Sequence, residues 1–114
     1  ERRQQIAQEY NTAFADLPVV TQGMSNGLNH NYHKYVVRFE DNSTRKRVKD
    51  AVNASIHYET PLSANSMYNG VESRRDACIA STTASNTVLS LPVHAWLTDT
   101  EISNIITTLK KCFE

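Results

Sequence analysis

Residues 31–40, NYHKYVVRFE, are the stretch that decides the fold. They combine aromatic and β-branched side chains, the residue types enriched in strands. Apolar side chains recur at every second position, which is the period of a half-buried strand. The face predicted to be apolar carries Tyr35, Val37 and Phe39. Because Val36 and Arg38 fall on the opposite face, this segment predicts one strand of a sheet.

Before this strand, the sequence predicts a helix over residues 1–17 and a loop over residues 21–29. Apolar residues of the helix recur at spacings of three and four, which places them in one stripe. That stripe contains Ile6, Tyr10, Ala13, Phe14 and Leu17. Pro18 marks the end of the helix, and the loop is rich in Gly, Asn and Ser, which are typical of turns.

After the strand, the sequence predicts a short helix over residues 44–52 and a second short strand over residues 54–58. The helix follows an Asp-Asn-Ser turn whose side chains are good N-caps. Its inward face is expected to carry Val48, Ala51 and Val52. Its solvent-facing side is expected to carry Arg45, Lys46 and Lys49.

The segment that follows has weaker signals. Residues 59–75 contain Pro and Gly and have no sustained period, so we expect a long loop of the kind that often carries function. Residues 76–86 are small and form a weak helix candidate. Residues 87–93 alternate as a strand does, and Pro92 places this strand at an edge or an end of the sheet.

The C-terminal helix is the most strongly specified element. Thr98 and Glu101 form a capping box, in which each side chain accepts a hydrogen bond from the other's backbone N–H. Leu97 before the cap and Ile102 after it can form a hydrophobic staple. The long apolar stripe of this amphipathic helix contains Ile102, Ile105, Ile106, Leu109 and Phe113.

Together these elements predict the α+β class for residues 1–114, taken as a single domain. We expect a small two-layer sandwich of about three short, mostly antiparallel strands packed by helices. Twelve basic and twelve acidic residues cancel, so net charge gives no reason to propose a nucleic-acid or membrane-surface partner. The chain begins Glu-Arg-Arg without a Met, and we expect it to be a piece of a longer protein.

The cellular location of the protein is predicted from its apolar segments and its cysteines. It has no apolar run of transmembrane length and no signal-peptide pattern. Cys78 and Cys112 match no zinc spacing and are interpreted as reduced thiols of a cytoplasmic protein. A Cys78–Cys112 bridge is the alternative, which geometry decides.

Few motifs carry chemistry. The sequence has no glycine-rich phosphate loop, HExxH, CxxC or nucleophile elbow. His30 and His33 have a spacing that a metal could use, but no Cys or carboxylate joins them at ligand spacing. The preferred interpretation of this pair is that it flanks the start of a strand.

His57 and Tyr58 lie at the end of a predicted strand, directly before the long loop, where binding sites are common. Both side chains can donate and accept hydrogen bonds. From spacing alone, the stronger interpretation is that Tyr58 packs in the core with its hydroxyl at the edge. By the same reasoning, His94 closes a turn and Trp96 anchors packing.

Several stretches, in one order, resemble the C-terminal small domain of the DegT/DnrJ/EryC1/StrS sugar aminotransferases. They are HNYHKYVVRFED (30–41), TRKRVKDAVNASIHYETPL (44–62) and NTVLSLPVHAWLTDTEISNIITTLKK (86–111). The segment RRQQIAQEYNTAF (2–14) is similar to the helix that leads into that domain. The most specific parts are IHYETPL (56–62) and LSLPVHAWLT (89–98), and the resemblance covers nearly the whole chain.

The resemblance implies a parent protein that is a fold-type-I pyridoxal-phosphate enzyme and a homodimer. Such enzymes transfer an amino group, usually from glutamate, to a keto-sugar attached to a nucleoside diphosphate. Their cofactor lysine and phosphate-binding residues lie in a large N-terminal domain, which this chain does not contain. The resemblance therefore implies no catalytic residue and no cofactor in residues 1–114, and we expect no transaminase activity from them alone. It also implies a bacterial, cytoplasmic enzyme of polysaccharide or deoxysugar biosynthesis.

In this family a His-Tyr pair lies at the substrate cleft near the nucleotide-sugar, often reaching across the dimer. The resemblance assigns that role to His57 and Tyr58. Three positions depart from the family pattern: Ser63 replaces a second histidine, Ala51 replaces a glycine, and Ala95 replaces the proline of a Pro-Trp pair. A diverged or inactive member is therefore an open alternative.

The leading hypothesis is thus a substrate-cleft domain of a nucleotide-sugar aminotransferase, separated from its cofactor domain. Such a fragment is expected to expose an apolar patch and to self-associate through it. The alternative is a stand-alone, non-catalytic α+β binding or interaction module. A small hydrolase that uses His57 or His94 is a third hypothesis, which nothing in the spacing supports.

Overall fold

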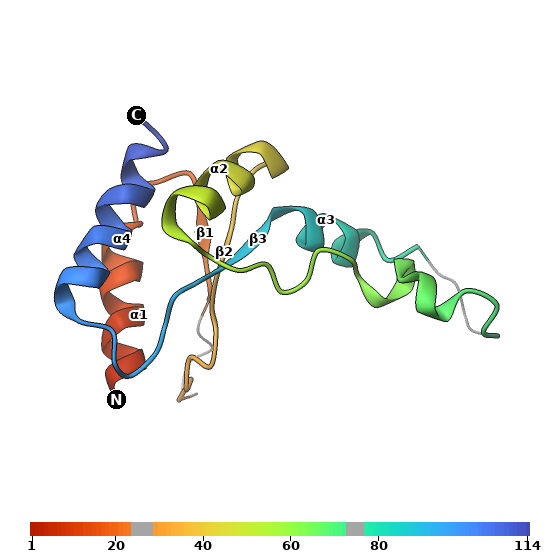
Figure 1. Ribbon diagram of the computed structural model, residues 1–114, viewed down its shortest axis with the longest axis horizontal. Helices are drawn as coiled ribbons and strands as arrows, with labels where there is room; N and C mark the ends of the chain where they lie inside the picture. The colour runs from red at the N-terminus through yellow and green to blue at the C-terminus, as the bar shows by residue number, and fades with distance from the viewer. Residues whose placement is uncertain (24–28, 73–76) are drawn as a thin grey trace.

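The computed structural model describes residues 1–23, 29–72 and 77–114. It has the predicted α+β class, with four α-helices and a three-stranded antiparallel sheet among these residues (Figure 1). The elements are α1 (Arg2–Ala13), β1 (Val20–Thr21), β2 (Tyr35–Arg38), α2 (Asn42–Val52), the 3-10 turns η1 (Leu62–Ala64) and η2 (Ser66–Tyr68), α3 (Ile79–Thr87), β3 (Val88–Leu91) and α4 (Asp99–Lys111). None of the described helices is long and apolar enough to cross a membrane.

The sheet has the order β1-β2-β3, with β2 in the centre. Tyr35 of β2 pairs with Leu91 of β3, and Val37 pairs with Leu89. All four side chains are buried, which confirms the predicted apolar face of the central strand. As Pro92 indicated, β3 lies at an edge of the sheet and ends immediately before that residue.

The third strand differs from the prediction. Residues 54–58 were predicted to form it, but only Ser55 pairs, in an isolated bridge with Ser90. The chain turns away from β3 after that bridge, so a ladder cannot extend. The third strand is instead β1, whose two residues pair with Val37 and Arg38. Two residues are too few to produce a recognisable period.

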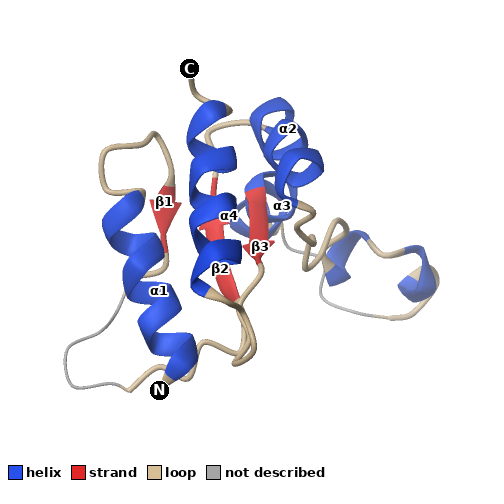
Figure 2. Ribbon diagram, turned by 60° about the vertical axis from the view of Figure 1, so that its left-hand side comes forward, coloured by secondary structure: helices blue, strands red, loops and turns tan. Residues whose placement is uncertain are grey.

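Helices and sheet enclose one apolar core. Helices α1 and α4 lie side by side over the sheet, and α2 packs against α4 and β3 (Figure 2). The largest fully buried side chains are Ile6, Tyr10, Phe14, Tyr35, Val37, Val48, Leu89, Ile102 and Leu109. Burying one large apolar side chain contributes roughly 1.5–3 kcal/mol. This layered core is the platform on which the candidate site rests.

The two capped helices begin as their sequences indicate. Thr98 Oγ1 accepts a hydrogen bond from the Glu101 N–H, and the Glu101 carboxylate accepts one from the Thr98 N–H, which confirms the capping box. These bonds lower the pKa of Glu101. In α2 the Asp41 carboxylate accepts from Ser43 and from the Thr44 N–H, and these bonds lower the pKa of Asp41 to about 2.

Helix α2 buries Val48 and Val52 as predicted, but two other positions differ from the prediction. Arg45 was expected in solvent but is 4% exposed, and Ala51 was expected in the core but is exposed. The Arg45 guanidinium donates a hydrogen bond of 2.7 Å to the Ser85 carbonyl, in the last turn of α3. A cation is favourable there because the C-terminal end of a helix carries partial negative charge. Arg45 therefore joins α2 to α3.

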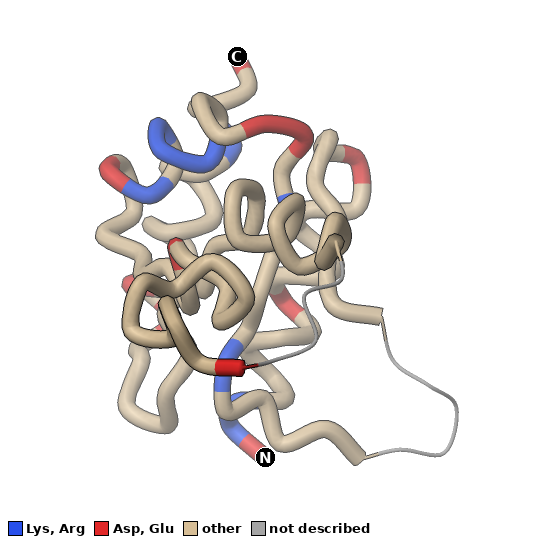
Figure 3. The backbone as a smooth tube through the Cα atoms, turned by 90° about the vertical axis from the view of Figure 1, so that its right-hand side faces the viewer, with Lys and Arg blue, Asp and Glu red and all other residues tan. Residues whose placement is uncertain are grey.

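Surface charge is mixed in sign. Figure 3 shows basic and acidic residues interspersed along the backbone, with the longest basic stretch on α2. Cys78 is exposed and Cys112 is half-buried, and both are free thiols. The alternative of a bridge between them is therefore not realised in the structure.

An arm extends from the body of the molecule (Figure 1). We define it as the described residues 58–72 and 77–79, which include η1 and η2. Six large apolar side chains of the arm are exposed: Tyr58, Leu62, Met67, Tyr68, Val71 and Ile79. The predicted loop 59–75 thus contains two short 3-10 turns in its described part.

Candidate functional site

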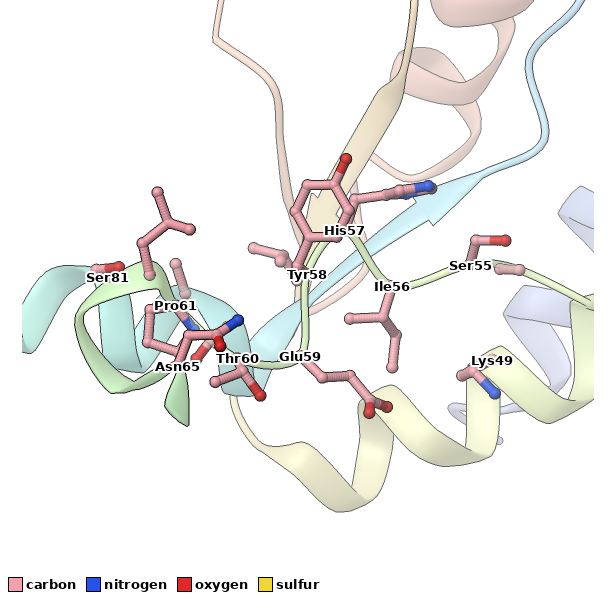
Figure 4. A pocket seen from close by; sticks show the side chains of 15 residues that line it. Lys49, Ser55, Ile56, His57, Tyr58, Glu59, Thr60, Pro61, Asn65 and Ser81 are labelled. Atoms are coloured by element: carbon pink, nitrogen blue, oxygen red, sulfur yellow. The ribbon is translucent and has the colours of Figure 1, made fainter. Parts of the chain in front are cut away.

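An open groove of about 1140 Å³ lies where α2, the segment after it and α3 meet (Figure 4). One wall is the segment from Ala54 to Leu62, and the flank of α3 forms another. The residues that line it are Lys49, Ala54, Ser55, Ile56, His57, Tyr58, Glu59, Thr60, Pro61, Leu62, Asn65, Ser81, Ala84, Ser85 and Val88. The groove therefore contains both residues that the sequence singled out.

Local backbone structure places these residues. Asn53 ends α2 in the left-handed conformation, with φ of 50°, which Asn tolerates better than most residues. Ser55 then exchanges two backbone hydrogen bonds with Ser90 of β3, of 3.2 and 2.8 Å. Because this bridge holds the segment on the edge of the sheet, His57 follows at a fixed position two residues later.

The His57 ring is half-buried and lies between two hollows. It lines the main groove and also a smaller one of about 280 Å³, whose other residues include His33, Lys34 and Ser90. Its Nδ1 lies 2.9 Å from Ser90 Oγ, within hydrogen-bond distance. Sequence reasoning missed Ser90, and the available signal was a polar residue inside an otherwise apolar strand.

Tyr58 stands at the rim of the groove and is 71% exposed (Figure 4). Its ring meets the His57 ring edge-on, with centroids 5.4 Å apart and planes at 86°. The peptide bond between the two residues is cis. The interpretation of Tyr58 as a core residue is wrong, because most of its surface is exposed. The structure thus brings His57 and Tyr58 together, while contact with a substrate stays a prediction.

The groove also contains unpaired charges. Lys49 is half-buried and Glu59 is exposed, and within the described residues neither is in an ion pair. The ion pair that the described chain does form joins Arg2 of α1 and Asp99 of α4, at 2.6 Å, and neither residue lines the groove. The groove therefore offers an imidazole, a phenol, an ammonium group, a carboxylate and several hydroxyls, which suit a polar ligand with hydroxyl groups.

Other candidates from the sequence lie elsewhere. His30 Nδ1 accepts a hydrogen bond of 2.9 Å from the Tyr32 N–H, and no group of three metal-ligating side chains occurs in the part of the chain that the structure describes. The His94 carbonyl accepts from the Leu97 N–H at 3.2 Å, which confirms that His94 closes a turn. Trp96 is 85% exposed, so it is not a packing anchor, and Leu97 is buried in its place.

Residues 1–110 match the DegT/DnrJ/EryC1/StrS aminotransferase family. The chain belongs to this family. A comparison with curated proteins gave no match.

Several solved structures share the fold. The aminotransferase TlmJ from Streptoalloteichus hindustanus superposes with a TM-score of 0.85 at 22% identity, covering 98% of this chain and 31% of that one. DesV from S. venezuelae, in complex with a ketimine intermediate, gives 0.86 at 22% identity, over 96% and 30%. The putative sugar aminotransferase Spr1654 from Streptococcus pneumoniae, in its PMP-form, gives 0.81 at 22% identity, over 97% and 30%.

This family member spans less than a third of the length of those structures. The family implies pyridoxal phosphate in a full-length enzyme, so the groove was compared with what that cofactor requires. A Schiff-base lysine is commonly activated by desolvation, and the cofactor phosphate needs a cradle of N–H donors. Lys49, the lysine among the described groove residues, is half-exposed, and α3 presents its flank to the groove. The residues that line the groove therefore do not fit the cofactor.

Proposed function

We propose that the chain is the substrate-cleft domain of a pyridoxal-phosphate-dependent nucleotide-sugar aminotransferase, and that it is inactive alone. In this proposal residues 1–114 are one small domain, and the cofactor is held by another part of a longer parent protein. The parent transfers an amino group from glutamate to a keto-sugar nucleotide. The observation that carries the proposal is the groove edged by His57 and Tyr58, in a chain that belongs to this aminotransferase family.

The side chains of the groove have the chemistry for such a substrate. His57 and Tyr58 can bond sugar hydroxyls or phosphate oxygens, and the exposed face of Tyr58 can stack on a flat group. Lys49 adds a positive charge, which attracts an anionic diphosphate, and the Glu59 carboxylate in the same groove opposes that attraction. Holding the substrate in one orientation lowers the barrier to reaction, and covering it excludes water. These are the roles that we assign to the domain.

Ser63 bears on how the substrate is held. It is exposed in η1, on the arm beside the groove, where the family pattern has a histidine. A serine side chain is shorter than a histidine and cannot reach as far into a cleft. We infer that the parent either holds its nucleotide-sugar with fewer contacts from the arm or accepts a different sugar.

The context that we propose is a bacterial cytoplasm, where such enzymes supply amino sugars for polysaccharide or deoxysugar synthesis. The parent is proposed to be a homodimer in which the apolar arm is covered.

A stand-alone binding module is the second candidate, because the chain has its own buried core beneath the groove. A gene that encodes some 250 further residues with a cofactor lysine favours the enzyme, and a start codon near Glu1 favours the module.

Absorbance titration with pyridoxal phosphate tests this assignment. We expect the 114-residue chain to give no band of bound cofactor and no amino transfer from glutamate to a keto-sugar nucleotide. The parent protein, assayed under the same conditions, serves as the positive control. Turnover or a bound-cofactor band with the chain alone would show that the cofactor site lies within these residues.

A further inference from the structure

The contact between Ser90 and His57 has a rigid geometry. Ser90 is 7% exposed in β3, and its backbone is held on both sides, by Val36 in β2 and by the bridge to Ser55. Its Oγ lies 2.9 Å from His57 Nδ1. The bridge joins Ser90 to Ser55, two residues before His57, and so holds the Ser90 hydroxyl close to the imidazole ring.

The direction of this hydrogen bond follows from burial. A buried hydroxyl proton needs an acceptor, because leaving it without one costs about 1–3 kcal/mol. Within the described residues, the Ser90 hydroxyl has no side-chain or backbone partner other than His57 Nδ1. If Nδ1 carried the proton, the hydroxyl could only accept, and its own proton would be left without a partner. The favoured arrangement is therefore Ser90 O–H donating to Nδ1.

We propose that Ser90 is a positioning residue that holds neutral His57 in the Nε2–H tautomer. Nδ1 is then the acceptor from Ser90, and Nε2–H is the donor that remains for a ligand. Nε2 has no partner within the described residues, and the ring lines both hollows. His57 thus recognises an oxygen acceptor, a hydroxyl or a phosphate, and the identity of that ligand rests on the function proposed above.

A serine and a histidine at this distance also resemble a nucleophile and its base. Burial argues against that role. The Ser90 hydroxyl lies in the sheet beneath the ring and has almost no exposed surface from which to attack a substrate. The Ser90–His57 pair therefore orients the ring, and the hydrolase hypothesis gains nothing from it.

Nitrogen NMR of the histidine rings, at a pH where His57 is neutral, tests the tautomer without any substrate. In the 114-residue chain we expect Nε2 of His57 to carry the proton almost completely and Nδ1 to show the shift of an unprotonated nitrogen. Ser90→Ala should return the ring to the mixture of tautomers found in free imidazole, and Ser90→Thr should restore the single form. Signals are assigned with His57→Gln, and the exposed His94 is the internal control.

Two outcomes overturn the proposal. One is a proton on Nδ1 in the wild-type chain, a measurement that does not depend on whether Ser90→Ala folds. The other is a tautomer population that Ser90→Ala leaves unchanged.

In the parent enzyme, Ser90→Ala should raise KM for the nucleotide-sugar by about threefold to tenfold, the effect of one weakened hydrogen bond. If Ser90→Ala alters the tautomer of His57 but leaves KM unchanged, the proposed contact of His57 with the ligand is overturned. If the parent does not use nucleotide-sugars, only the proposed function is overturned.

Discussion

Two buried tyrosines show how the core of this domain accommodates polar atoms. Tyr35 Oη donates to Asn11 Oδ1 at 2.7 Å, and Tyr10 Oη donates to the Pro92 carbonyl at 3.0 Å. Their ring centroids are 5.1 Å apart. Burial raises the pKa of both hydroxyls above the ordinary value of 10.0. Each ring thus fills the core while its hydroxyl is satisfied at the edge.

Tyr35→Phe tests this arrangement. At neutral pH we expect the free energy of unfolding to fall by about 1 kcal/mol, because one hydrogen bond is lost. The folded pKa of Tyr35 lies above the unfolded value of 10.0, so its contribution is complete below pH 10 and is lost as the pH rises further. Tyr35→Phe should therefore lose less stability between pH 10 and pH 11 than the wild type does. Urea unfolding at several pH values measures both effects.

Tyr58→Phe is the matched control for that experiment. Tyr58 is mostly exposed, so its hydroxyl should contribute little to folding. Equal losses of stability in Tyr35→Phe and Tyr58→Phe, or an unaltered alkaline dependence in Tyr35→Phe, would contradict the assignment of Tyr35 to a satisfied core position.

Single residues were predictable where local pattern decides their environment. The alternation around β2 correctly placed Tyr35, Val37 and Phe39 in the core. Arg45 was misplaced because its acceptor, the Ser85 carbonyl, lies 40 positions away in the sequence. Tyr58 and Trp96 were misplaced because large aromatic side chains are usually buried, whereas the described chain leaves most of the surface of both exposed. The pairing of His57 with Ser90 is equally non-local.

Helices and strands were also predictable where interactions within their own residues define them, and not where distant segments of the chain do. Helix α4 was predicted in full because its capping box and apolar stripe lie within its own residues. The strand predicted over residues 54–58 shrank to one bridge, since strand pairing depends on what the neighbouring edge offers. The groove could not be predicted at all, because α2 and α3 are brought together only by the fold.

Most of the exposed large apolar side chains of the described chain lie on the arm. Its exposed apolar side chains include Leu62, Met67 and Ile79, each more than 70% exposed. Apolar surface gathered on one segment commonly marks an interaction site. We expect the 114-residue chain to self-associate in sedimentation velocity runs as its concentration rises, and the double variant Leu62→Glu with Met67→Glu to shift it toward monomer.

Val20→Glu is the control for the arm variants. Val20 is 54% exposed but lies in β1, outside the arm. A wild-type chain that stays monomeric at every concentration would show that the arm does not drive association. Equal dissociation by Val20→Glu would place the contact elsewhere on the molecule.

At the scale of the whole molecule, we propose that the groove is one wall of a substrate site. The chain covers about 30% of the sugar aminotransferase structures that share its fold. The residues that line the groove offer hydrogen-bonding groups for a polar ligand but do not fit the cofactor. We therefore propose that this domain binds substrate and that the rest of a parent enzyme carries the cofactor chemistry.

Steady-state kinetics of the parent enzyme with His57→Ala test that division of roles most directly, with His94→Ala as the control. We predict that KM for the nucleotide-sugar rises by about tenfold or more in His57→Ala, because a hydrogen bond to the substrate is lost. The half-reaction with glutamate should keep its wild-type rate, as should both half-reactions in His94→Ala. An unchanged KM for the nucleotide-sugar, or an equal loss in the glutamate half-reaction, would contradict the account.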